Sequence, residues 1–80
     1  MKEIIIDVRT VEEWNEGHAP CSINVPLDTI AERATEFLDY DRVTIVCRSG
    51  ARASNAQAIL QSVGVKNIEN KGPWQSISCS

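Results

Sequence analysis

The feature of this sequence that most constrains its fold is the alternation of apolar, β-branched runs with helix-forming segments. The runs are "EIIIDV" at 3–8, "SINVP" at 22–26, "RVTIVC" at 42–47 and "KNIEN" at 66–70, where "KGPW" then breaks the chain. They are short and continuously apolar rather than alternating, which is typical of strands buried in a parallel sheet. We therefore predict an α/β fold, with a small parallel sheet of about four strands and helices on both faces.

The segments between these runs carry helix signals. Thr10 and Glu13 have the spacing of a capping box, and Gly17 follows as a stop signal. A second helix is predicted from Asp28 or Thr29 to about Tyr40, with a core-facing stripe of Ile30, Ala34, Phe37 and Leu38. A third is predicted over 51–64, with an inward stripe of Ala56, Ile59, Leu60 and Val63.

The length and the hydropathy of the chain limit the class of protein. Its 80 residues suffice for one small domain, which we place at 1–80. Its apolar runs are far shorter than the roughly 20 residues that span a membrane. The start, "MKEIIIDVR", has too short an apolar stretch for a signal peptide. We therefore expect a cytoplasmic protein or, as the alternative, the mature periplasmic form of an exported one, with Met1 added.

Charge is distributed unevenly along the chain. The formal net charge is −3, with three basic residues against ten acidic ones in 1–41 and five basic residues against one acidic residue in 42–80. A mildly acidic chain argues against binding to nucleic acid. The basic residues that surround Cys47 instead suit a small anion.

The three cysteines, Cys21, Cys47 and Cys79, are odd in number and widely spaced. This is a poor disulfide framework and is typical of a reduced compartment. A zinc site built from these cysteines and His18 would lack the paired close spacing of structural zinc ligands. We therefore expect no metal and no cofactor.

The stretch "CRSGAR" places a thiol at the carboxyl end of a predicted strand, where parallel sheets bind their ligands. Cations and the first amides of the following helix lower the pKa of a thiol, and Cys47 has Arg48 and Arg52 nearby. The helix amides, with the Ser49 hydroxyl, would form a cradle for an anion, and Gly50 would allow the tight turn. A cysteine that is merely buried at a strand end is the plainer alternative.

Three motifs in order resemble the rhodanese superfamily, specifically small single-domain sulfurtransferases of the phage-shock-protein-E type. They are "IIDVRTVEEWNEGHAP", "SINVPL" and "VTIVCRSGARAS", and the resemblance runs from about Ile4 to Gly72. The chain departs from the family pattern in three places. Cys21 stands where the family usually has glycine, "NKGPW" has Lys71 in place of a glycine and an early Trp74, and the usual extra strand before "DVR" is missing.

The resemblance implies a role for each matching residue. Cys47 would accept a sulfane sulfur as a persulfide. The loop amides would hold that sulfur, and Arg52, together with Arg48, would bind the oxyanion of the donor. The loop residues concerned are Arg48, Ser49, Gly50, Ala51 and Arg52.

Four further residues match supporting positions of the family. Asp7 and Arg9 would brace the sheet end near the loop, and Glu13 and His18 would shape the rim of the site. From the strand pattern alone we expect the side chains of Asp7 and Arg9 to point to opposite faces, and solvated charges remain an equal alternative.

The sequence thus predicts an enzyme of the thiosulfate sulfurtransferase type. Its partners would be a small sulfur-containing anion such as thiosulfate and a thiol acceptor, either a small thiol or a thioredoxin-like protein, or cyanide in vitro. We expect Cys21 and Cys79 to be dispensable. One alternative is a non-catalytic sulfur-binding or partner-docking module. Another is a cysteine-dependent phosphatase or arsenate reductase, but those families place five residues between cysteine and arginine, and this chain has four.

Overall fold

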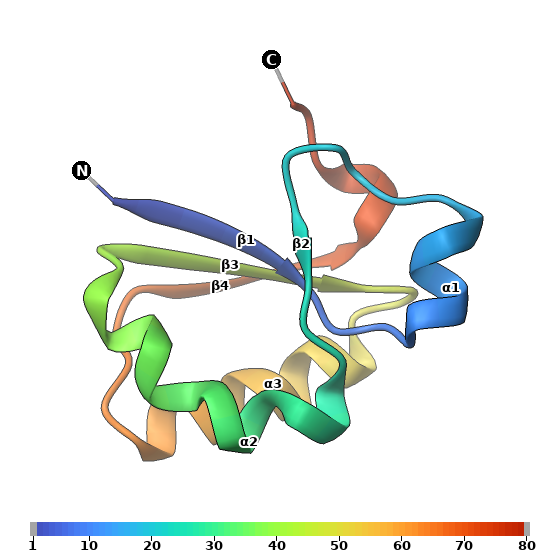
Figure 1. Cartoon of the computed structure of the whole chain (residues 1–80). Helices are drawn as coiled ribbons and strands as arrows, with labels where there is room; N and C mark the ends of the chain where they lie inside the picture. Colours follow the sequence, from blue (N-terminus) through green and yellow to red (C-terminus); the bar gives the residue numbers. More distant parts are fainter. Residues whose placement is uncertain (1, 80) are drawn as a thin grey trace.

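A computed structural model describes residues 2–79 and contains one four-stranded sheet (Figure 1). The strands are β1 (Glu3–Asp7), β2 (Ile23–Asn24), β3 (Arg42–Cys47) and β4 (Ile68–Pro73). Their order is β2-β1-β3-β4, and each neighbouring pair is parallel. The predicted parallel α/β sheet is therefore confirmed, and the carboxyl ends of its strands lie together at one edge.

The last strand continues further than its sequence predicts. We expected it to end at Asn70, before "KGPW", but β4 extends to Pro73, which lies beside Cys47. The pairing with β3 passes from Asn70 to Gly72, so Lys71 is an extra residue that forms a β-bulge. Gly72 has φ 75°, a conformation that favours glycine, and this lets the strand resume its pairing.

Within residues 2–79 there are three α-helices and three 3₁₀ helices, and all but the last of them lie between strands. They are α1 (Val11–Glu16), η1 (Leu27–Thr29), α2 (Ile30–Arg33), η2 (Ala34–Asp39), α3 (Ala51–Ser62) and η3 (Trp74–Ser76). Figure 1 shows α2 and α3 together on one face of the sheet and η3 on the opposite face, whereas α1 lies beyond the carboxyl ends of the strands. The predicted capping box is present at the start of α1, where the Thr10 hydroxyl accepts a hydrogen bond from the Glu13 amide.

The helix predicted over 28–40 is broken into η1, α2 and η2. A 3₁₀ turn has three residues per turn rather than 3.6, so the predicted stripe rotates out of register within η2. Ile30 and Phe37 still face the core, but Leu38 is 49% exposed, contrary to the prediction. Val63 is also exposed, at 38%, because α3 ends at Ser62.

The core lies between one face of the sheet and the helices α2 and α3 that cover it. Its members are Ile6, Val8, Val25, Ile30, Ala34, Phe37, Val43, Ile45, Cys47, Ala53, Ala56, Leu60 and Val65. Cys47 is part of this cluster and is only 1% exposed, so the strand that carries the thiol is fixed by packing. Among residues 2–79, no helix is both long and apolar enough to cross a membrane.

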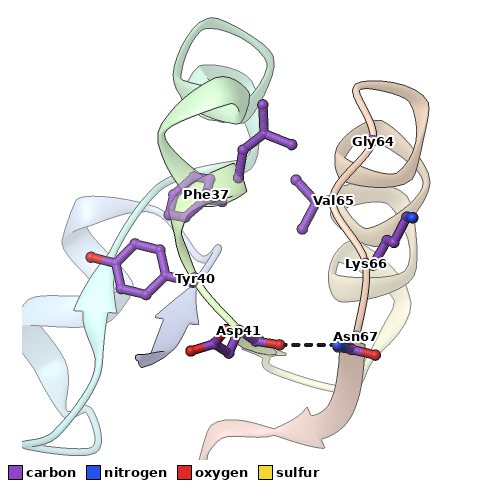
Figure 2. A pocket seen from close by; sticks show the side chains of 8 residues that line it. Phe37, Tyr40, Asp41, Gly64, Val65, Lys66 and Asn67 are labelled. Carbon is purple, nitrogen blue, oxygen red and sulfur yellow. Dashed lines mark hydrogen bonds between the residues drawn. The ribbon is translucent and has the colours of Figure 1, made fainter. Parts of the chain in front are cut away.

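A pocket of about 190 Å³ opens at the end of the sheet away from Cys47. Figure 2 shows Phe37 and Tyr40 on one side of it and Val65 and Lys66 on the other, with a hydrogen bond between Asn67 and the main chain of Asp41 at its base. Asp41 directly precedes β3, whereas Cys47 ends the same strand, so this pocket is separate from the cysteine loop.

Candidate functional site

The cysteine loop joins the end of β3 to the start of α3. Cys47 is the last residue of the strand, and Ala51 is the first residue of the helix. Gly50 caps the helix with φ 103°, and a Cβ there would lie 3.4 Å from the Gly72 Cα. Both the positive φ and the close neighbour explain why this turn requires glycine.

The main-chain amides of the loop are directed at the thiol. The Gly50 amide donates a hydrogen bond to the Cys47 Sγ at 2.9 Å. Burial raises the pKa of the Cys47 thiol, but hydrogen bonds from the amides of Ala53, Gly50, Ser49 and Arg52 lower it by more, so the pKa lies below its usual value. This arrangement stabilises a thiolate at the carboxyl end of the sheet, which is the reactive form of cysteine.

Arg52 is held by a carboxylate from α1. Its guanidinium forms a bidentate ion pair with Glu13, with Nη1–Oε1 and Nη2–Oε2 distances of 2.6 and 2.9 Å. Hydrogen bonds from Arg52 and from Thr10 lower the pKa of Glu13 to about 2. The arginine expected to bind an oxyanion therefore has an anionic partner within the protein, and the helix cap of α1 orients that partner.

Asp7 and Arg9 form a buried ion pair, so the expectation that they point to opposite faces was wrong. Arg9 donates from Nε and Nη2 to the Asp7 carboxylate at 2.9 and 2.8 Å. The two side chains are 0% and 6% exposed, which also excludes solvated charges. Residues i and i+2 of an extended chain share a face, and this allows the two side chains to meet.

Arg9 also connects β1 to α1 and to the C-terminal segment. Its Nη2 donates to the Gly17 carbonyl at 2.7 Å and its Nη1 to the Glu13 carbonyl at 3.3 Å. The Trp74 ring covers the guanidinium, with 4.9 Å between Cζ and the ring centroid. The same indole lies 3.4 Å from the position that a Cβ on Gly17 would occupy.

The other predicted site residues lie around the loop. Arg48 and Ser49 are exposed. His18 stacks on Trp14, with ring centroids 3.5 Å apart, and its Nδ1 is hydrogen-bonded to the Trp14 carbonyl at 2.7 Å. Within residues 2–79, no hydrogen bond joins His18 to Cys47.

Cys21 and Cys79 form a disulfide, so the expectation of reduced cysteines was wrong for this pair. Their Cα atoms lie 5.6 Å apart although 58 residues separate them in the chain. Cys47 is the free cysteine. An odd number of cysteines does not exclude a disulfide, because one free thiol and one disulfide also account for three cysteines. In the described part of the chain, no three His, Cys, Asp or Glu side chains cluster as metal ligands.

The sequence reasoning missed a residue that supports the loop from β4. The Asn70 amide group donates to the Gly50 carbonyl at 3.1 Å and to the Ser54 hydroxyl at 3.0 Å. Its side-chain oxygen accepts from the Gly72 amide at 2.8 Å. No local pattern marks Asn70, because its role depends on the bulge that brings β4 alongside the loop.

A groove of about 400 Å³ lies beside the loop. Its lining is largely apolar, and the guanidinium-bearing side chain of Arg52 forms one wall. The lining residues are Val8, Thr10, Pro26, Leu27, Asp28 and Arg52. The groove leaves room for a ligand next to the arginine of the loop.

Comparison with known proteins identifies a family for this chain. Residues 1–72 match the model of the rhodanese-like domain. The thiosulfate sulfurtransferase PspE of Escherichia coli is 36% identical over 75 residues, covering 91% of this chain and 72% of that protein. A sulfurtransferase of Allochromatium vinosum is 34% identical over 67 residues, covering 84% of this chain and 63% of the relative.

Solved structures agree with this likeness. A structure described as rhodanese with anions, from E. coli, superposes with a TM-score of 0.85 at 35% identity, covering 98% of this chain and 94% of that one. The chain spans 37% of a Bacillus subtilis relative and 60% of one from Schizosaccharomyces pombe, so some relatives are considerably longer. The match over 1–72, together with the parallel sheet and its cysteine loop, shows that the chain belongs to the rhodanese-like domain family.

Proposed function

We propose that this protein is a sulfurtransferase that moves a sulfane sulfur from thiosulfate, or a similar anion, to a thiol through a persulfide on Cys47. The observation that carries the proposal is the free, buried thiol of Cys47. Its Sγ accepts a hydrogen bond from the Gly50 amide at 2.9 Å. The sulfurtransferase names of the relatives from E. coli and A. vinosum support it.

The first half-reaction loads the cysteine. The Cys47 thiolate attacks the outer sulfur of thiosulfate, a new S–S bond forms, and the old S–S bond breaks. Sulfite leaves with the electron pair of the broken bond, and the persulfide keeps the negative charge on its outer sulfur. The loop amides that lower the pKa of Cys47 are placed to stabilise this charge.

The second half-reaction unloads it. The thiolate of an acceptor attacks the outer sulfur of the persulfide and forms a persulfide of its own. The electron pair of the Cys47–sulfur bond returns to Cys47 as a thiolate, which is ready for another cycle. The apolar groove beside Arg52 offers room for the organic part of the acceptor. Whether the acceptor is a small thiol or a thioredoxin-like protein is decided by comparing the two as substrates.

The two arginines of the loop are the proposed binders of the donor's oxyanion. Arg48 is exposed and its guanidinium can turn towards an arriving anion. Arg52 is one-third exposed and shares its guanidinium with Glu13, so binding an anion requires it to use its remaining N–H groups or to exchange partners. Its planar set of donors suits the oxygens of a sulfonate better than an ammonium does.

The disulfide favours the second of the two compartments that the sequence left open. Cys21 and Cys79 are both exposed, and exposed disulfides persist in oxidising surroundings rather than in the cytosol. We therefore place the working protein outside the cytoplasm. Fractionation of cells that express the complete natural gene tests this placement, and recovery with cytosolic markers would contradict it.

The experiment that tests the function is intact-mass analysis after incubation with thiosulfate. The expected result is a gain of one sulfur, mapped to Cys47, with turnover when cyanide is added. Cys47→Ser should show neither, while Ser62→Ala, a change at the exposed far end of α3, should keep the adduct. Lack of an adduct on wild type with Cys47 reduced would contradict the proposal.

The role of Arg52 is tested by two variants. Arg52→Ala should lower kcat/KM for thiosulfate by on the order of ten- to a hundredfold, since a charge-assisted hydrogen bond is lost. Arg52→Lys should fall between that variant and wild type. Equal kcat/KM in all three proteins would exclude Arg52 from donor binding.

A further inference from the structure

The disulfide connects the two edges of the sheet. Cys21 lies just before β2, and Cys79 lies after β4, and these strands occupy opposite ends of the order β2-β1-β3-β4. Between them, the segment 74–79 leaves Pro73, passes over Arg9 through Trp74, and reaches the turn that contains Cys21. Figure 1 shows this C-terminal segment beside the loop that leads into β2.

Few hydrogen bonds hold segment 74–79 in place. Its hydrogen bonds are local, from Ser76 to the Lys71 and Pro73 carbonyls and from the Ile77 amide to the Trp74 carbonyl. Among the hydrogen bonds of the described residues, one joins segment 74–79 to a residue outside 71–79, and it runs from the Cys21 amide to the Cys79 Sγ, next to the disulfide itself. The disulfide and the packing of Trp74 on Arg9 attach the segment to the rest of the domain.

The segment is linked to the cysteine loop through a continuous set of contacts. Trp74 covers Arg9, and Arg9 holds α1 through the carbonyls of Glu13 and Gly17. The Glu13 carboxylate in turn accepts hydrogen bonds from both terminal guanidinium nitrogens of Arg52, Nη1 and Nη2. If Trp74 no longer covered Arg9, the Arg9 side chain would be held less firmly. Because Arg9 holds α1, the position of Arg52 would then also be less fixed.

The disulfide is also more accessible to a reductant in solution than the Cys47 thiol is. Cys21 and Cys79 are exposed, whereas Cys47 is 1% exposed. We propose that the Cys21–Cys79 disulfide is a redox-sensitive strap, which a dithiol opens, and that Trp74 is a positioning residue that the strap keeps over Arg9. Opening the strap weakens the binding of the anionic donor at the loop.

The chemistry is a dithiol–disulfide exchange. One thiolate of the dithiol attacks the Sγ of Cys79 or Cys21, and the other cysteine leaves as a thiolate. The second thiol of the reductant then displaces the protein from the mixed disulfide. The dithiol is oxidised to a disulfide, and its two electrons and two protons convert Cys21 and Cys79 to thiols.

The release of the segment is tested by fluorescence. In Trp14→Phe, which keeps an aromatic ring against His18, the remaining indole is Trp74. Reduction with dithiothreitol, followed by desalting under nitrogen, should shift its emission to longer wavelength as the indole becomes solvated. The same treatment of a Trp14→Phe/Cys21→Ser/Cys79→Ser variant should change nothing. An unchanged spectrum on reduction of the disulfide-bonded protein would overturn the proposal.

The coupling to the loop is tested by kinetics, and this arm rests on the proposed sulfurtransferase function. With cyanide as acceptor, reduced wild type and Cys21→Ser/Cys79→Ser should both show a KM for thiosulfate raised about two- to fivefold, which is the range expected for the loss of one aromatic–cation contact. The kcat should stay unchanged, and reoxidation should restore the wild-type KM. An unchanged KM, with the emission shifted, would overturn the coupling.

A separate readout distinguishes failure of the strap from failure of the proposed function. Oxidised wild type and Cys21→Ser/Cys79→Ser each carry one reactive thiol, Cys47, and its rate of alkylation by iodoacetamide needs no turnover. The rate at neutral pH should fall in the open variant, because Arg52 is fixed less firmly near the thiolate. If neither protein transfers sulfur, equal alkylation rates would still overturn the strap's effect on the loop.

Discussion

Replacing Asp7 with asparagine should strongly destabilise the fold. The Asp7 carboxylate is fully buried and accepts hydrogen bonds from the Arg9 main-chain amide, Nε and Nη2 at 3.0, 2.9 and 2.8 Å. In Asp7→Asn the Arg9 guanidinium stays buried without a counter-charge, and the new amide group presents N–H donors to it. Breaking a buried ion pair in this way costs about 3–5 kcal/mol.

That cost is large for a domain of this size. At roughly 0.05–0.15 kcal/mol per residue, a chain of 80 residues has a free energy of unfolding of about 4–12 kcal/mol. Asp7→Asn should therefore remove about a quarter or more of it. Urea unfolding followed by far-UV circular dichroism should show a much lower midpoint with an unchanged slope. Asp28→Asn, at an exposed position, is the matched control and should stay within about 0.5 kcal/mol of wild type.

A double-mutant cycle separates the ion pair from other effects of the substitution. Arg9→Met removes the buried cation, so adding Asp7→Asn to it should cost far less than Asp7→Asn alone costs. The coupling free energy should exceed about 1 kcal/mol. Additive effects of the two substitutions, or an Asp7→Asn variant within about 1 kcal/mol of wild type, would refute the reasoning from the buried pair.

Three further predictions follow from the site and the disulfide. The loop amides lower the pKa of Cys47, so its rate of alkylation by iodoacetamide should reach half its maximum at lower pH than that of an unfolded peptide carrying the same cysteine; equal midpoints would contradict the thiolate cradle. Glu13 has its pKa lowered to about 2 from 4.5, so the Glu13–Arg52 pair stabilises the fold above pH 4.5 and loses this contribution as pH falls through about 2. Glu13→Gln should therefore lower the free energy of unfolding by on the order of 1 kcal/mol at pH 7 and make little difference near pH 2, as urea unfolding at both values will reveal. Reducing the Cys21–Cys79 disulfide, which closes a loop across a separation of 58 residues, should lower the free energy of unfolding by about 4 kcal/mol, with Cys21→Ser/Cys79→Ser as the variant that reduction leaves unaffected.

Local features of the chain were readable from the sequence. Continuous β-branched runs predicted β1 and β3, and the spacing of Thr10 and Glu13 predicted the cap of α1, because these signals act between neighbours along the chain. The position of Cys47 at a strand end followed from the same runs, and three motifs in order, of which the cysteine loop is one, indicated the family that the comparisons establish.

Other features depended on packing against distant elements. The residues after Asn70 carry turn signals, but hydrogen bonding to β3 keeps them in a strand as far as Pro73. The segment 28–40 has a helical pattern, yet closing it over the core required two 3₁₀ turns, and Leu38 became exposed as a result. Local propensity is weak compared with the free energy of burying the neighbouring core side chains.

The connections around the site were decided by tertiary structure alone. Glu13 and Arg52 are 39 residues apart, and Cys21 and Cys79 are 58 apart, so no pattern along the chain pairs them. The parallel sheet brings Glu13 and Arg52 together because β1 and β3 are neighbours that end side by side. Cys79 reaches Cys21 because segment 74–79 crosses from β4 to the turn before β2. The sequence by itself determined the buried strands β1 and β3, the cap of α1 and the place of Cys47 at a strand end. The partners of Arg52 and Cys21 depend on distances that only the folded sheet sets.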